Sequence, residues 1–145
     1  MIRIITLLIL WLGFGANTVF AQNSATNQSL IIHNEDNLNA VLGSISNKLN
    51  ETLPMMVDAQ TQLDASMGFQ RMFLYRYTLV NLALENVDVT EFKSQMEPRI
   101  VNTICTTEKM QFFVVNDITM IYSYYGKAGK QIAEIEVPAS RCADF

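Results

Sequence analysis

Apolar residues recur with two different periods along this chain, and the change between them limits the possible folds most strongly. Between residues 35 and about 51 they follow the spacing of one face of an α-helix, at Leu38, Val41, Leu42, Ile45 and Leu49. From about 69 to 84 the chain is rich in aromatic and β-branched residues, which predicts a strand pair or one long strand. Helical spacing returns after Asp88, and alternation returns between Ile118 and Val137.

The first helix has a clear start and a clear end. Glu35 and Asp36 place negative charge in its first turn, where the helix dipole favours it. Pro54 is expected to end the helix before it, because the residue preceding a proline avoids helical geometry. The proline-interrupted segment 53–58 is then expected to be an extended connection packed on the core.

The second helix and the last strands carry similar signals. Asp88, followed three residues later by Glu91, is typical of a helix start, and Pro98 is expected to kink or split the helix. A short helical turn is expected over 108–113, and the glycines within 126–130 predict a β-hairpin turn. The element order predicts an α+β fold, with a three- or four-stranded antiparallel sheet and helices packed on one face.

The first 21 residues have the order of a secretory signal peptide. Arg3 precedes an apolar run from Ile4 to Phe14, and a small and polar stretch follows and ends at Ala21. The run is shorter than the ~20 residues that a membrane-spanning helix needs. We therefore expect cleavage after Ala21, a periplasmic or secreted protein, and no stable membrane insertion after cleavage. Residues 22–34 are expected to form a polar flexible leader before a single domain at 35–145.

Charge and length limit the class of partner. Loss of Arg3 with the signal peptide leaves 9 basic side chains against 14 acidic ones, a formal charge of −5. Nucleic acids and anionic membrane surfaces select for clustered Lys and Arg, so no nucleic-acid partner is expected. The remaining chain of about 124 residues suits one domain with a real hydrophobic core.

Two cysteines, Cys105 and Cys142, are present in a chain that we expect to reach an oxidising compartment. This number favours one intramolecular disulfide, which would join the second helical region to the C-terminal tail. Closing a loop of about 37 residues is worth roughly 3 to 4 kcal/mol in the chain-entropy account. Two buried free thiols or a metal pair are the alternatives. Because His33 is the only histidine, the ligands for a structural zinc are lacking, and no metal site is expected.

Catalytic groups are sparse in this sequence. His33 has no second histidine to work with, so it is interpreted as a residue at the helix entry. Asp58 and Asp64 are interpreted as turn and cap residues rather than a general acid and base. No catalytic residue and no cofactor are therefore predicted.

Aromatic residues form the strongest candidate for a binding site. Tyr75, Tyr77, Tyr122 and Tyr124, joined by further aromatic residues at 69, 73 and 125, lie on segments expected to be side by side. Such a cluster can line a groove for a ligand or a peptide. Cross-strand aromatic packing needs the same residues in the same places, so a purely structural role is the alternative.

Three parts of the sequence resemble a group of small exported bacterial proteins of unknown function. These are Leu53–Asp58, Tyr75–Asn81, and the two cysteines around Tyr122–Lys127. The resemblance covers about residues 50–142, most of the expected domain. It implies a periplasmic or secreted protein and carries over no catalytic residue.

Together these features predict a non-enzymatic binding or accessory protein in the periplasm or outside the cell. Its aromatic sheet face, or a groove beside that face, would hold a protein or a small ligand. The alternative is an inhibitor or immunity-type protein that neutralises an exported cationic enzyme through its acidic surface.

Overall fold

The computed structural model describes residues 31–143 and 145, so the predicted cleavage site and most of the predicted leader lie outside the described residues. Three α-helices are present in this part: α2 (Glu35–Asn50), α3 (Val89–Thr106) and α4 (Gln111–Val115). Five strands accompany them: β1 (Met55–Met56), β2 (Thr61–Phe69), β3 (Met72–Leu79), β4 (Thr119–Gly126) and β5 (Gln131–Val137). Short 3-10 turns lie at Leu84–Asn86, Glu108–Met110 and Ala139–Cys142.

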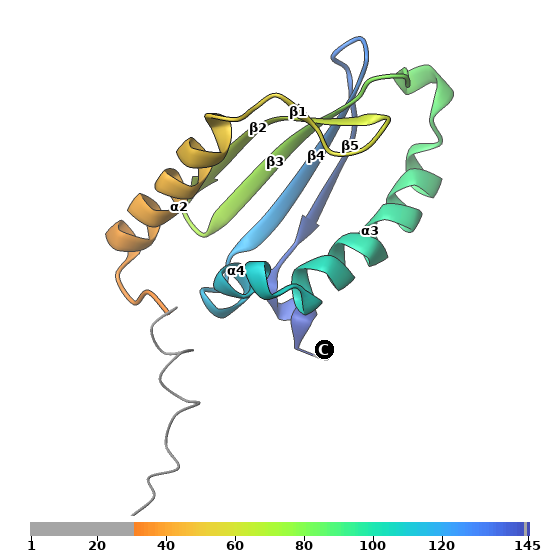
Figure 1. Ribbon diagram of the computed structural model, residues 1–145. Helices are drawn as coiled ribbons and strands as arrows, with labels where there is room; N and C mark the ends of the chain where they lie inside the picture. The colour runs from red at the N-terminus through yellow and green to blue at the C-terminus, as the bar shows by residue number, and fades with distance from the viewer. Residues whose placement is uncertain (1–30, 144) are drawn as a thin grey trace, which may run out of the picture.

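The strands form one sheet in the order β1-β2-β3-β4-β5 (Figure 1). The α+β class is confirmed, but the predicted three- or four-stranded antiparallel sheet is wrong. The sheet has five strands, and β3 and β4 pair in parallel while the other neighbours are antiparallel. Parallel neighbours need a long crossover connection, and here α3 and α4 carry the chain back to the starting end of β3.

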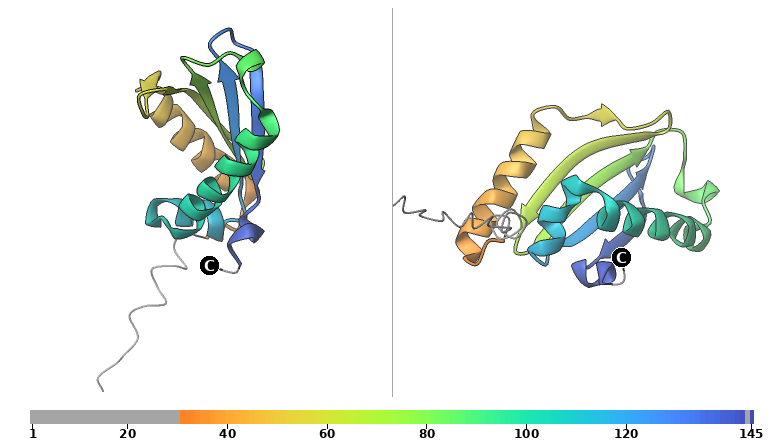
Figure 2. Two further views of the ribbon diagram at one scale, coloured as in Figure 1. Left: turned by 90° about the vertical axis from the view of Figure 1, so that its right-hand side faces the viewer. Right: turned by 60° about the horizontal axis from the view of Figure 1, so that its bottom comes forward.

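All three helices lie on one side of the sheet (Figure 2), as predicted. At one edge α2 packs on β2, and towards the other edge α3 packs on β5. Gly68 of β2 lies directly beneath α2, where an added Cβ would lie 2.7 Å from the carbonyl oxygen of Leu42. A side chain at this position would force α2 away from the sheet, so the close contact requires glycine.

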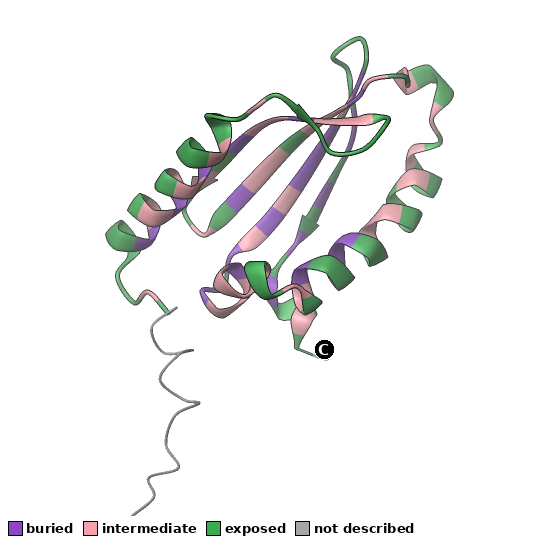
Figure 3. Cartoon of the chain, in the orientation of Figure 1, coloured by how far each residue is buried: buried purple, intermediate pink, exposed green. Residues whose placement is uncertain are grey.

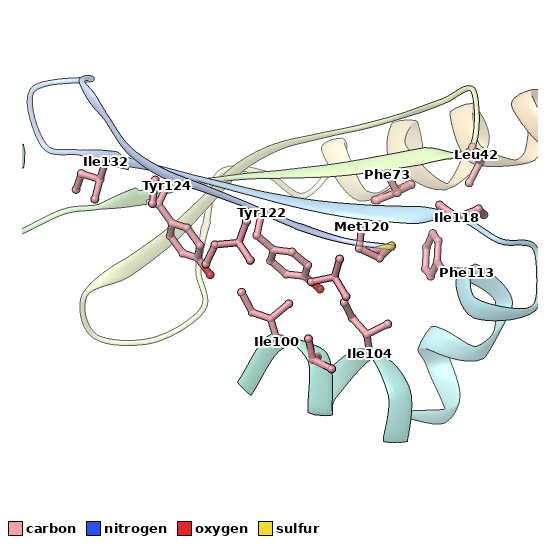
Figure 4. Close-up of a cluster of buried hydrophobic side chains, with 14 of the residues drawn as sticks. Leu42, Phe73, Ile100, Ile104, Phe113, Ile118, Met120, Tyr122, Tyr124 and Ile132 are labelled. Carbon is pink, nitrogen blue, oxygen red and sulfur yellow. The ribbon is translucent and has the colours of Figure 1, made fainter. Parts of the chain in front are cut away.

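The hydrophobic core fills the space between the sheet and the helices (Figures 3 and 4). Alternate residues of β3, β4 and β5 face the helices, as the pleat of a strand requires. The largest fully buried side chains are Phe73, Leu38, Leu42, Ile104, Ile118, Met120 and Val137. The side that faces the helices is called the helix face, and the opposite side is called the open face.

Side chains of α2 attach this helix to the outer edge of β2. The Asn50 amide donates to the backbone oxygen of Ser66 at 2.9 Å and accepts from the backbone nitrogen of Ser66 at 2.8 Å. The Asn39 side chain accepts from the backbone nitrogen of Gln70 at 2.8 Å. At the start of α2, the Asn34 side chain accepts from the backbone nitrogen of Asn37 and satisfies a free helix donor.

The second helical region begins as predicted. The Asp88 carboxylate accepts hydrogen bonds from the backbone nitrogens of Thr90 and Glu91. Two outcomes were predicted for Pro98, a kink or a split of the helix. The helix continues through Pro98 to Thr106, so it is not split.

The predicted disulfide is present: Cys105, near the end of α3, is bonded to Cys142, with the two Cα atoms 5.2 Å apart. The bond joins the helix layer to the turn that follows β5.

The segment around Pro54 differs from its prediction. It was expected to pack on the core, but Met55, Met56 and Val57 are 43%, 47% and 48% exposed. Met55 and Met56 form the short strand β1 and pair with Leu63 and Gln62 of β2. Apolar character predicted burial here, whereas the segment lies at the sheet edge, where backbone pairing holds it in place.

Candidate functional site

Four of the aromatic residues selected from the sequence form one continuous row on the helix face. Tyr75 of β3 is paired in register with Tyr122 of β4, and Tyr77 is paired with Tyr124. Ring centroids lie 5.5 Å apart in the first pair and 5.3 Å apart in the second. Tyr77 also stacks on Tyr122, with centroids 6.2 Å apart and ring planes 3° from parallel. These four residues are called the tyrosine row.

Not every predicted member of the aromatic cluster joins the row. Phe73 lies on the same face, with its ring 5.1 Å from that of Tyr75 and 5.0 Å from that of Phe113. Tyr125 lies on the open face beneath the Arg76 guanidinium, which is 4.3 Å from the ring centroid. Phe69 also belongs to the open face, because it is two residues from Met67 and adjacent to the inward Gly68.

The tyrosine row lies between the two long helices. Since α2 covers β2 and α3 covers β5, the row on the central strands β3 and β4 lies between them (Figure 1). Tyr122 and Tyr124 point from the sheet towards α3 (Figure 4) and are 7% and 4% exposed. Tyr75 and Tyr77 are half-buried. The row is therefore packed at its rings but only partly covered.

The hydroxyl groups of the row keep their hydrogen-bonding capacity. Within residues 31–143, no hydrogen bond is made by the hydroxyls of Tyr75, Tyr77, Tyr122 or Tyr124. Yet the same part of the chain holds no fully buried side-chain nitrogen or oxygen atom that lacks a partner. These hydroxyls therefore reach the accessible surface, where water or a bound molecule can pair with them.

Burial makes the tyrosine hydroxyls weaker acids. It raises the pKa of Tyr75 to about 12. Burial, together with the nearby charge of Asp58, raises the pKa of Tyr124 to about 12. Desolvation also raises the pKa values of Tyr77 and Tyr122. All four side chains are neutral at pH 7, so the row presents neutral donors and acceptors rather than charge.

One end of the row opens into a cleft of about 440 Å³. The cleft lies between the β1–β2 connection and α3, and it contains Tyr77 and Tyr124 of the row. Its other lining residues are Val57, Asp58, Gln60, Thr61, Leu79, Leu82, Phe92, Met96 and Arg99. An apolar and aromatic cleft with a few polar groups is the usual composition of a binding site for an organic group.

Sequence reasoning missed the α3 wall of this cleft. Phe92, Met96 and Arg99 belong to the segment after Asp88 for which the sequence predicts only a helix. The Phe92 ring packs edge-on against Tyr124, with centroids 5.1 Å apart. Spacing along α3 places the three residues near one another, but only the tertiary fold shows that they face the row.

The two aspartates have structural partners. The Asp58 carboxylate accepts from the backbone nitrogens of Gln60 and Thr61, and the resulting turn connects β1 to β2. These bonds lower the pKa of Asp58. The Asp64 carboxylate accepts from the hydroxyl of Thr78 and the amide of Gln62. The turn role predicted for Asp58 agrees with these bonds, whereas the loop position predicted for Asp64 is wrong, because Asp64 lies within β2.

The described residues contain no group of three or more His, Cys, Asp and Glu side chains placed to hold a metal ion. His33 is exposed and directly precedes the Asn34 cap of α2. Among the helices of the described part, none is long and apolar enough to cross a membrane.

Comparisons with known proteins identify the fold. No family model matches the chain, and no curated protein matches its sequence. Three solved structures of bacterial proteins are similar over most of their length. One, from Pseudomonas aeruginosa and assigned as a secreted protein, has a TM-score of 0.64 and 10% identity, and covers 74% of this chain and 95% of its own.

The other two are pilotins of type II secretion systems. The Vibrio vulnificus pilotin EpsS has a TM-score of 0.61 and 13% identity, over 77% of this chain and 96% of the pilotin. The Vibrio cholerae pilotin AspS has a TM-score of 0.58 and 17% identity, over 74% of this chain and 94% of the pilotin. At these identities the similarity shows a shared fold: the chain has the fold of two secretion-system pilotins and a secreted protein.

Proposed function

We propose that this chain is an exported, non-enzymatic accessory protein that binds a segment of a partner protein along the tyrosine row. The observation that carries the proposal is the state of the four hydroxyls. They reach the accessible surface without a hydrogen-bond partner in the described residues, although their rings are packed on the sheet. A purely structural aromatic row does not need four accessible hydroxyls, whereas a bound peptide backbone supplies donors and acceptors for them.

The surroundings of the row support a polypeptide ligand. The row joins a cleft with apolar walls from α3 and from the β1–β2 connection, so side chains of a bound segment have a place to be buried. The similar fold of two type II secretion pilotins supports an accessory role in export or secretion rather than catalysis. The signal-peptide pattern of residues 1–21 supports a periplasmic or secreted location.

Site-specific photocrosslinking in the cell that exports the protein tests the proposal. A photoreactive phenylalanine analogue replaces Tyr77, which is half-buried on the helix face. The matched control replaces Thr78, the next residue of β3, which faces the opposite side of the sheet. We expect a crosslinked product of defined mass from position 77 that is absent from position 78.

The product is then identified by mass spectrometry, and its crosslinked segment is synthesised as a peptide. Binding of this peptide should weaken by about tenfold or more with Tyr75→Ala. If positions 77 and 78 give the same products, or if the peptide binds Tyr75→Ala as tightly as the unaltered protein, the tyrosine row is not the binding site.

A further inference from the structure

The open face carries an apolar half and a polar half. Successive rows across the sheet are fixed by the pairing register, in which Phe69 lies beside Met72, and Met67, Leu74 and Ile121 lie side by side. These two rows form the apolar half, which is called the methionine patch: Met67, Phe69, Met72, Leu74 and Ile121. The next two rows carry polar residues and charges, among them Arg76, Thr78 and Glu134.

The methionine patch is unusually exposed. Met67, Phe69 and Met72 are 60%, 51% and 42% exposed, whereas Leu74 and Ile121 beside them are half-buried. No described helix lies over this side of the sheet (Figure 2). Clustered exposed apolar side chains mark interaction surfaces, and methionine adapts its shape to a partner at low cost.

Charges beside the patch indicate what covers it. The Arg76 guanidinium lies over Tyr125 and forms no ion pair with any described carboxylate. Glu134 and Glu136 lie exposed on the same face of β5 and also form no ion pair within residues 31–143. The four ion pairs of the described part all lie elsewhere.

We propose that the open face binds a second copy of this chain. In a two-fold contact the same surface of both copies meets, so if residue i of one copy touches residue j of the other, residue j of the first also touches residue i of the second. The open face carries the apolar patch, the Arg76 cation and the carboxylates of Glu134 and Glu136, with Asp64 as a third carboxylate that is hydrogen-bonded to Gln62 and Thr78. Under this symmetry the patch can pack on its own copy, and Arg76 can meet the two β5 carboxylates. The two patches pack together at the usual sheet-to-sheet distance of about 10 Å, and Arg76 of each copy meets the acidic β5 side chains of the other.

Two methionines of nearly equal exposure provide the test. Met72 of the patch is 42% exposed, and Met55 of β1, outside the patch, is 43% exposed. The exported, processed protein is studied by sedimentation velocity up to about 200 µM, beside Met72→Glu and Met55→Glu. We expect a concentration-dependent dimer, a dimer dissociation constant raised about tenfold or more by Met72→Glu, and no change with Met55→Glu.

Arg76→Glu is a second test variant, because it places the new carboxylate of one copy near Glu134 and Glu136 of the other. We expect a weaker dimer, and the melting temperature of each variant shows that the fold is intact. A monomer at the highest concentration overturns the proposal, whether the patch is covered by residues 22–30, by another protein or by nothing. A dimer weakened equally by Met55→Glu and Met72→Glu overturns it as well, because the contact then lies elsewhere. The result is independent of the tyrosine row on the other face.

Discussion

The two faces of strand β3 show how differently one strand can present its residues. Towards the helices it presents Phe73, Tyr75, Tyr77 and Leu79, and towards the open side it presents Met72, Leu74, Arg76 and Thr78. Phe73 is fully buried, whereas its neighbour Met72 is 42% exposed. The rigid rings are placed where a fixed set of neighbours packs around them, and flexible or charged side chains are placed on the other side.

This difference teaches that apolar character alone does not distinguish the two faces. Both contain large apolar residues, but the helix face is stabilised by packing within the chain. The methionine patch has few such contacts, so its residues contribute little to the stability of the single chain. Four changes test how far this contrast holds, in order of expected effect.

Truncation of adjacent residues gives the largest contrast. Phe73→Ala should lower the free energy of unfolding by about 3 to 5 kcal/mol, because it leaves a cavity beside Tyr75 and Phe113. Leu74→Ala, one residue along on the open face, should cost about 1 kcal/mol. Urea denaturation of the two variants measures the difference, and similar losses would show that the two faces are equally packed.

Removal of the disulfide tests how the helix layer is held to the sheet. Cys105→Ser should lower the free energy of unfolding by about 2 to 4 kcal/mol and the melting temperature by about 10 °C. Cys142→Ser should have the same effect, and the double variant should be no worse, because each change removes the same bond. Thermal unfolding measures all three. A double variant that is much less stable than either single one would contradict this account.

Alkaline pH should destabilise the helix face through its tyrosines. The folded protein holds the Tyr124 proton up to a pKa of about 12, above the ordinary value of 10.0, because the side chain is buried. The unfolded chain loses that proton first, so the stabilisation is complete below pH 10 and is lost between pH 10 and pH 12. In Tyr124→Phe, the free energy of unfolding should therefore fall by about 2 to 3 kcal/mol less between pH 10 and pH 12 than in the unaltered protein.

Denaturation at several pH values, together with tyrosinate absorbance, measures the effect of Tyr124. Tyr125 of the open face provides the matched control, because Tyr125→Phe leaves the buried row unchanged. An equal change in the pH profile for both variants would contradict the assignment to Tyr124.

Adjacent residues of β2 give the smallest contrast. Gly68→Ala should cost about 1 to 3 kcal/mol, because the new Cβ meets the Leu42 backbone and α2 must move. Met67→Ala, on the open face, should change the free energy of unfolding of the monomer by about 0.5 kcal/mol or less. Chemical denaturation at low protein concentration measures both, and a neutral Gly68→Ala would show that α2 adjusts freely over β2.

Much of the helical structure could be predicted because its signals are local. The apolar stripe from Leu38 to Leu49 and the Asp88 cap each lie within one segment, and both helices begin where these signals indicate. The C-terminal hairpin also follows from alternation and a glycine-containing turn. In each case neighbouring residues decide the conformation, so one segment of sequence is enough.

Strand β2 and the direction of β4 could not be predicted in this way. The helix-side positions of β2 include Ser66 and Gly68, which are small or polar because α2 approaches closely there. Strand β2 therefore lacks the apolar alternation of a typical strand. The parallel pairing of β3 with β4 depends on how α3 and α4 return the chain, and no short segment records it.

For the candidate site, the sequence predicted that the tyrosines lie side by side, and the structure shows the row formed by residues 75, 77, 122 and 124. Their role in binding stays a proposal. The cleft at the end of the row could not be predicted, because Phe92, Met96 and Arg99 reach it only through the tertiary packing of α3.

The side-chain amides of α2 have a further consequence for self-assembly of the sheet. Exposed strand edges recruit other strands and lead to aggregation. Along the outer edge of β2, the carbonyl oxygen of Thr61 accepts from the backbone nitrogen of Val57, and Leu63 is paired with Met55 of β1. The backbone groups of Ser66 bond to the Asn50 amide, and the Gln70 nitrogen bonds to Asn39. Asparagine side chains thus imitate a sixth strand and stop the sheet from growing there. At the opposite edge of the described sheet, the exposed Glu134 and Glu136 of β5 disfavour edge-to-edge pairing of two β5 strands, because that pairing brings like charges together.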